Sequence, residues 1–128
     1  MQLFVNLPVR DLDRSKKFFT ELGFNLFGMG EGMASVVINE ETQVMILTEP
    51  LFASYITKET TDAEKSTEAI LVLGLENPAA VDALVDKALA AGATPAGVKQ
   101  EPGFRYQRGF ADLDGHHWEA LCLVQPAS

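Results

Sequence analysis

The sequence has a single cysteine, few basic side chains and no long hydrophobic run. A single cysteine excludes an internal disulfide, and Cys122 lies in the apolar run 120–124, which favours a buried, unreactive thiol in a reducing compartment. No stretch approaches the roughly 18 apolar residues that a membrane-spanning helix needs. Residues 1–9 lack the charged start and the long apolar stretch of a secretory signal. We therefore expect a cytoplasmic protein.

Positive charge is also scarce, because 10 Lys and Arg residues stand against 18 Asp and Glu residues, for a net charge of −8. A surface that binds nucleic acid needs clustered Lys and Arg to displace counterions, and so does one that binds anionic lipid. We expect neither partner, and read the net charge as a source of solubility. Hydrophobic residues make up 47% of the chain, enough for the core of one domain.

The same order of predicted elements occurs twice: a strand, a capped helix, a glycine and three further strands. Asp11 is the expected N-cap of the first helix, and Gly23 ends it. Asn77 caps the second helix before Pro78, and Gly92 ends it. The repeat predicts an α+β fold of two βαβββ modules. The β-rich runs predict strands at 2–9, 24–29, 34–39, 43–48, 69–75, 93–99, 106–111 and 116–124.

Residues 50–66 separate the two copies. Leu51, Phe52, Tyr55 and Ile56 have the spacing of one or two helical turns, and 58–66 is polar and rich in threonine. We expect a single domain over residues 1–128, with module one at 1–49, a connector at 50–66 and module two at 67–124. Phe52 is either a lid over a binding cleft or a side chain packed against the connector.

Three segments carry distinctive sequences. Residues 4–19 read FVNLPVRDLDRSKKFF, residues 110–119 read FADLDGHHWE, and a helical segment at 81–93 lies between them. These segments resemble the start of the first module, the closing hairpin and the helix before it in glyoxalase/bleomycin-resistance proteins of the vicinal oxygen chelate superfamily. Among the relatives are uncharacterised bacterial proteins predicted to be lactoylglutathione lyases. The resemblance implies a curved mixed sheet with a U-shaped cleft, and a homodimer.

The resemblance also implies where a metal would bind. Relatives that use a divalent metal take His, Gln or Glu ligands from the first and last strand of each module. These positions fall at Phe4, Ile46, Ile70 and Glu119, so only Glu119 offers a donor atom. We therefore expect no metal and no other cofactor. A bound divalent metal stays open as the alternative, because Glu68 lies close to Ile70 and the alignment there can slip.

His117 and Glu119 share one face of the last predicted strand, because side chains alternate along a strand. The pair could perform acid/base chemistry or form an atypical metal site, or His117 could be a polar part of the cleft wall. Arg108 beside Glu119 could hold a substrate carboxylate or neutralise Glu119 in a structural ion pair. His116, next to Gly115, is expected to bond to the loop backbone.

Two functions remain from this reasoning. The first is binding of a small organic molecule without metal, in a largely apolar cleft. The second is a metal-dependent glyoxalase-like lyase, isomerase or dioxygenase, with Glu119 as ligand or base and His117 or Arg108 assisting. The apolar ligand positions favour binding, whereas His117 with Glu119 keeps the enzyme possible. The expected cleft residues are Phe4, Asn6, Ile46, Phe52, Ile70, Tyr106, Arg108, His117 and Glu119.

Overall fold

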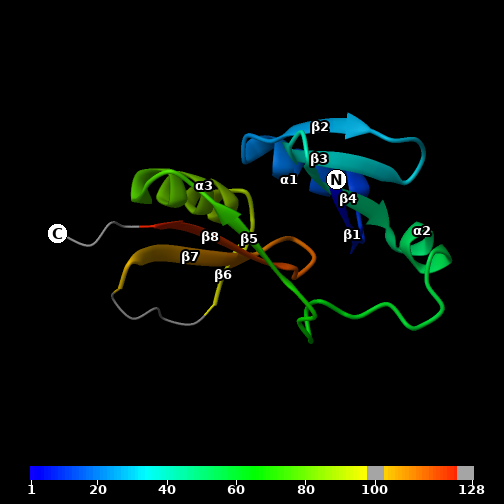
Figure 1. Cartoon of the computed structure of the whole chain (residues 1–128). Helices are drawn as coiled ribbons and strands as arrows, with labels where there is room; N and C mark the ends of the chain where they lie inside the picture. The colour runs from blue at the N-terminus through cyan, green and yellow to red at the C-terminus, as the bar shows by residue number, and fades with distance from the viewer. Residues whose placement is uncertain (98–102, 124–128) are drawn as a thin grey trace. The chain divides into compact units, whose positions relative to one another are not determined.

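The computed structural model describes residues 1–97 and 103–123 (Figure 1). The chain divides into two compact units, of which the first ends at Asp62 and the second begins at Ala63. Each unit contains one four-stranded mixed sheet, and helices accompany both sheets. The predicted α+β fold of two modules is confirmed.

The first unit has the strand order β1-β4-β3-β2, in which β1 runs parallel to β4 and the other neighbours are antiparallel. Helix α1 contacts β2, β3 and β4, and its apolar side chains Phe18 and Phe19 are buried. Helix α2 contacts β1 and β4, so it packs on this unit. The elements are β1 (Leu3–Val9), α1 (Leu12–Glu21), β2 (Asn25–Gly28), β3 (Met33–Asn39), β4 (Thr42–Thr48) and α2 (Glu49–Ser54).

The second unit repeats this topology with the strand order β5-β8-β7-β6, in which β5 runs parallel to β8. Helix α3 contacts β7 and β8 and lies along one face of the sheet (Figure 1). The elements are β5 (Ile70–Gly74), α3 (Pro78–Ala90), β6 (Thr94–Ala96), β7 (Arg105–Ala111) and β8 (His117–Leu123). The predicted internal repeat is therefore present at the level of sheet topology.

The predicted helix ends are confirmed in both units. The side chain of Asp11 accepts a hydrogen bond from the Arg14 N–H at 3.1 Å, and Asn77 accepts one from the Ala80 N–H at 2.8 Å. Gly23 and Gly92 follow the two helices with φ angles of +102° and +112°, a left-handed backbone that glycine adopts without steric cost. Local sequence therefore sets both helix boundaries.

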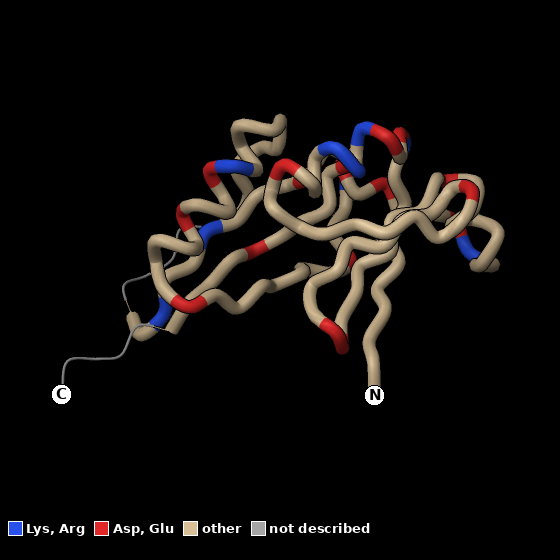
Figure 2. The backbone as a smooth tube through the Cα atoms, turned by 90° about the horizontal axis from the view of Figure 1, so that it is seen from above, with Lys and Arg blue, Asp and Glu red and all other residues tan. Residues whose placement is uncertain are grey.

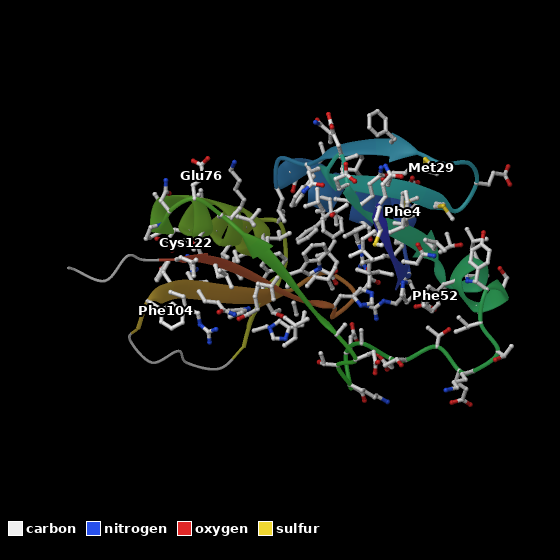
Figure 3. All side chains as sticks on the ribbon, viewed as in Figure 1. Phe4, Met29, Phe52, Glu76, Phe104 and Cys122 are labelled. Carbon is white, nitrogen blue, oxygen red and sulfur yellow. The ribbon has the colours of Figure 1, made fainter. Side chains whose placement is uncertain are left out.

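The turn between β7 and β8 is organised by the buried carboxylate of Asp112. It accepts hydrogen bonds from the backbone N–H groups of Asp114 and His116 and from Trp118 Nε1, each at 3.0 Å. Burial raises the pKa of Asp112. The main chain of His116 belongs to this turn, and the expected bond from its side chain to the loop backbone stays a prediction. Cys122, further along β8, is buried as predicted and lies on the side of the strand toward α3 (Figure 3).

Two predicted strands and one predicted turn include residues that the structure does not describe. The strand expected at 93–99 is observed only as β6, and residues 98 and 99 lie outside the description, as does the turn expected at Glu101 and Pro102. The predicted end of the last strand at Val124 also lies outside it. Among residues 1–97 and 103–123, no helix has the length and apolar character needed to cross a membrane.

Candidate functional site

The strand register of the second sheet fixes which side chains share a face. Glu119 lies opposite Val72 on β5 and Gly109 on β7, while Ile70 lies opposite His117. Paired residues project to the same side of a sheet, and alternate residues of one strand do the same. The face opposite α3, called the open face below, therefore carries Ile70, Val72, Ala96, Gln107, Gly109, His117 and Glu119.

The carboxylate of Glu119 is the central polar group of the open face. Glu119 is only 5% exposed. Its Oε1 atom accepts a hydrogen bond from Gln107 Nε2 at 2.9 Å, and its Oε2 atom lies 2.9 Å from His117 Nε2. The structure thus joins the two residues of the predicted His–Glu pair and adds Gln107 to them. The result is a buried carboxylate held by two side chains, called the Glu119 cluster below.

Two glycines provide the space that the Glu119 side chain fills. A Cβ atom at Gly109 would lie 1.5 Å from Glu119 Oε2, and a Cβ atom at Gly97 would lie 3.0 Å from it. Gly97 also has a φ angle of +92°, which disfavours any other residue. Sequence reasoning missed Gln107 and both glycines. A glycine inside a strand is a known signal of close approach, so Gly109 could have been found.

The amide oxygen of Gln107 is a buried acceptor without a hydrogen-bond partner in the described part of the chain. Its orientation is set by Nε2, which donates to Glu119. Turning the amide over would bring an amide oxygen against a carboxylate oxygen, which is repulsive. The orientation with an unpaired amide oxygen is therefore the favourable one. Buried acceptors are normally paired, so this oxygen is available to accept a hydrogen bond from another group.

Arg108 and Tyr106 lie on the face toward α3, so the predictions that Arg108 lies beside Glu119 and that Tyr106 shares a cleft with it are wrong. Tyr106 donates its hydroxyl to Asp82 Oδ1 at 2.7 Å, and Arg108 Nη1 lies 2.9 Å from the same atom and 3.0 Å from Asp86 Oδ1. The hydrogen bond from Tyr106, and then that from Arg108, lowers the pKa of Asp82. These side chains link β7 to α3, so Arg108 forms a structural ion pair with α3 and not the predicted one with Glu119.

The register of the first sheet corrects a second prediction. Phe4 pairs with Gln43 and Asn6 pairs with Met45, so these four side chains share a face. Ile46 pairs with Leu7, lies on the other face and is fully buried, so it does not line a surface with Phe4. The prediction was one residue out of phase, because residues 44–47 are all apolar and all buried and show no alternation.

The two registers also match the units residue by residue. Phe4 faces Gln43 as Ile70 faces His117, and two residues further along, Asn6 faces Met45 as Val72 faces Glu119. Met45 rather than Ile46 is therefore the counterpart of Glu119. Phe52 is half-buried on α2, and its predicted role as a lid stays a prediction.

The residues at the four positions that relatives use for metal do not fit a divalent cation. With the corrected register they are Phe4, Met45, Ile70 and Glu119, which offer two hydrocarbon side chains, one thioether and one carboxylate. Divalent cations such as Zn²⁺ and Mg²⁺ need several nitrogen, oxygen or thiolate donors. Within residues 1–97 and 103–123, no group of three or more His, Cys, Asp or Glu side chains is arranged so that it could hold a metal ion. Whether the protein carries a metal stays a prediction.

Comparison with known proteins agrees with this fold. Residues 2–39 match the family described as bleomycin resistance protein-like N-terminal. A hypothetical protein from S. aureus is 29% identical, with a TM-score of 0.78 over 95% of this chain and 93% of that one. A glyoxalase-related enzyme from Fulvimarina pelagi is 19% identical, with a TM-score of 0.80 over 95% and 87% of the two chains.

An antibiotic binding protein, TnmS3 from Streptomyces sp. CB03234, is a further structural neighbour. It is 20% identical, with a TM-score of 0.67 over 97% of this chain and 96% of that one. A search of curated proteins found no match. The chain therefore has the fold of the glyoxalase/bleomycin resistance proteins, and the match over residues 2–39 supports the same superfamily.

Proposed function

We propose that this protein is a member of the glyoxalase/bleomycin resistance superfamily that binds a small organic molecule on the open face of its second sheet, without the metal of its metal-using relatives. One observation carries the proposal: the buried Glu119 cluster lies beside exposed apolar side chains. Ile70 and Val72 are 52% and 49% exposed, and they pair directly with His117 and Glu119. Apolar surface around a few fixed polar groups is the usual composition of a ligand site.

Two further points support binding over metal chemistry. Phe4, Met45 and Ile70 stand where relatives carry ligands, and none of them is a donor for a hard cation. One structural neighbour is itself named an antibiotic binding protein. The resemblance to predicted lactoylglutathione lyases stays a prediction, since no neighbour described above carries that name.

The second candidate function is a glyoxalase-like lyase, isomerase or dioxygenase, and the His117–Glu119 contact favours it. A carboxylate 2.9 Å from an imidazole nitrogen can exchange a proton with it, so the pair is suited to acid/base catalysis. This candidate needs a metal or an acid/base step at Glu119. Metal analysis of protein purified without chelator separates the metal-dependent enzyme from the binding protein, because a near-stoichiometric divalent ion contradicts the binding proposal. Loss of any detected turnover in Glu119→Gln tests the acid/base step.

The binding proposal is tested by a thermal-shift screen of small aromatics and thiol conjugates, followed by NMR titration of each hit. We expect the perturbed amide signals to include Ile70, Val72, Gln107 and His117. Substituting Val72→Lys, at an exposed position of the open face, should weaken each hit. Ala83→Lys, which places the same side chain at an exposed position of α3 on the other side of this sheet, should leave the hits unchanged. Hits that perturb other surfaces only would contradict the proposal.

A further inference from the structure

We infer that the open face of the second sheet selects ligands whose polar head is a hydrogen-bond donor, above all a cationic nitrogen such as an ammonium or amidinium group. The inference rests on the proposed function and adds the chemical class of the ligand. Two observations support it: the Glu119 cluster has more hydrogen-bond acceptors than donors, and the strands around it carry few positive charges.

The Glu119 cluster offers acceptors and few donors. An ionised carboxylate has about four lone-pair sites. Only Gln107 Nε2 and His117 Nε2 contact the oxygens of Glu119 among the bonds described, which leaves lone pairs on both atoms. The amide oxygen of Gln107 adds a third acceptor, which has no partner among residues 1–97 and 103–123. Gln107 Nε2 already directs one of its N–H groups at Glu119, and the acceptor sites of the cluster outnumber its donors, so a ligand that enters it meets mainly acceptors.

The charges around the cluster favour the same class of ligand. Of the titratable side chains on the open face, β8 contributes His117 and Glu119, β7 contributes Arg105, and β5 and β6 contribute none. Arg105 lies four residues before Gly109, about 13 Å along an extended strand. Arg108 points away to Asp82 and Asp86. The chain as a whole carries a net charge of −8, which attracts cations from a distance (Figure 2).

A carboxylate ligand is disfavoured by the same geometry. The basic group that could have held a substrate carboxylate, Arg108, lies on the other side of the sheet. An anionic head entering the cluster would meet Glu119 and the Gln107 oxygen, while Arg105, the Lys or Arg that strands β5 to β8 place on this face, lies about 13 Å along its strand. Like charges at short range in a shielded site repel strongly. A donor head finds acceptors there, and Ile70 and Val72 offer contact to an apolar body.

Three probes of similar size and different heads test the inference: benzylammonium, benzyl alcohol and phenylacetate. Affinities are measured by NMR titration of the full chain, following the amides of Ile70, Val72 and His117. We expect benzylammonium to bind most tightly, benzyl alcohol more weakly and phenylacetate least. Phenylacetate binding as tightly as benzylammonium would overturn the inference.

Variants then assign the selectivity to the cluster. Glu119→Gln keeps the shape of the side chain but removes its charge, and should weaken benzylammonium about 10- to 100-fold, the range expected for one charge-assisted hydrogen bond. Benzyl alcohol should change by less than about threefold. Glu76→Gln removes an equal charge from an exposed position of the same unit, beside α3, and should change neither probe (Figure 3). Equal effects of the two variants would overturn the inference.

A second variant guards against a misfolded Glu119→Gln protein. Gln107→Leu removes the unpaired acceptor and leaves the charge of Glu119, and should weaken benzylammonium about tenfold. If neutral aromatics perturb the open face but benzylammonium does not, the ligand class is wrong and the proposed function stands. If no compound perturbs this face, the proposed function itself fails, and the inference fails with it.

Discussion

Gly109 lies next to the carboxylate of Glu119, which occupies the space where another residue would have a side chain. A Cβ atom at this position would lie 1.5 Å from Glu119 Oε2 and 2.8 Å from the carbonyl oxygen of Ala96. Gly109→Ala must therefore displace Glu119. We expect the free energy of unfolding to fall by about 1–3 kcal/mol, as is typical of overpacking. Urea denaturation measures the loss, and the NMR signals of the His117 ring report the broken contact with Glu119.

Gly74 provides the matched control for this substitution. It lies on β5 of the same sheet, and a Cβ atom there would meet nothing within 4 Å. Gly74→Ala should therefore leave the His117 signals and the unfolding midpoint nearly unchanged. If the two glycine variants behave alike, the crowding at Gly109 is not what positions Glu119.

Single residues that act through local backbone chemistry could be predicted from the sequence. Asp11, Asn77, Gly23 and Gly92 were predicted correctly, because a cap or a left-handed glycine depends on neighbours within a few positions. The site residues that depend on another strand could not be predicted in this way. Gln107 was missed because its partner, Glu119, is 12 residues away and a hairpin lies between them.

At the scale of elements, the sequence did not show which face of one strand continues a given face of its neighbour in the sheet. Alternation shows which residues of one strand share a face, and Tyr106 does share a face with Arg108. It does not show which of the two faces of β7 continues that of Glu119, since this depends on how the turn at residues 112–116 sets the register. The same lack of register information explains why Ile46 was predicted at the position that Met45 occupies.

The contact between β7 and α3 gives a prediction about pH. The hydrogen bond from Tyr106 is the largest cause of the lowered pKa of Asp82, so Tyr106→Phe should move that pKa upward, toward its ordinary value of 3.8. NMR titration of the Asp82 carboxyl carbon measures the shift. Asp86→Asn, which leaves the Tyr106–Asp82 bond intact, should have a smaller effect.

The sign of the effect on stability follows from this lowered pKa. A carboxyl group that is more acidic in the folded state stabilises the fold above its unfolded pKa, and the contribution disappears as the pH falls through the folded value. Wild-type protein should therefore lose this stabilisation below about pH 3.8, while the Tyr106→Phe variant has less to lose. Acid unfolding curves that separate further as the pH falls would contradict the assignment.

At the scale of the whole molecule, one topology is used twice with different side chains at matching positions. In both units the first strand runs parallel to the last strand, and the two middle strands follow it in the sheet as antiparallel neighbours. The sequence repeat predicted this much, because each copy carries its own caps and turns. The chemistry differs, since Met45 occupies the position in the first unit that Glu119 occupies in the second.

The resemblance to glyoxalase/bleomycin-resistance proteins predicts a homodimer. Light scattering behind size exclusion should give a mass of twice 13.9 kDa at micromolar concentration. A mass that stays at 13.9 kDa across a concentration series would contradict this prediction. Because the dimer is predicted from the resemblance alone, this measurement does not bear on the Glu119 cluster.

The matching positions around Glu119 and Met45 constrain how such a tandem protein can diversify. In the second sheet Glu119 has Gly109 and Ala96 across the adjacent strands, whereas Met45 has Ser35 and Phe27. A glutamate introduced at position 45 alone would fit the space of Met45, since its side chain is no larger, but its buried charge would need hydrogen-bond donors beside it. A lineage that gains an acidic group in this half is therefore expected to acquire such donors first, so the polar partners come before the charge in the order of substitutions.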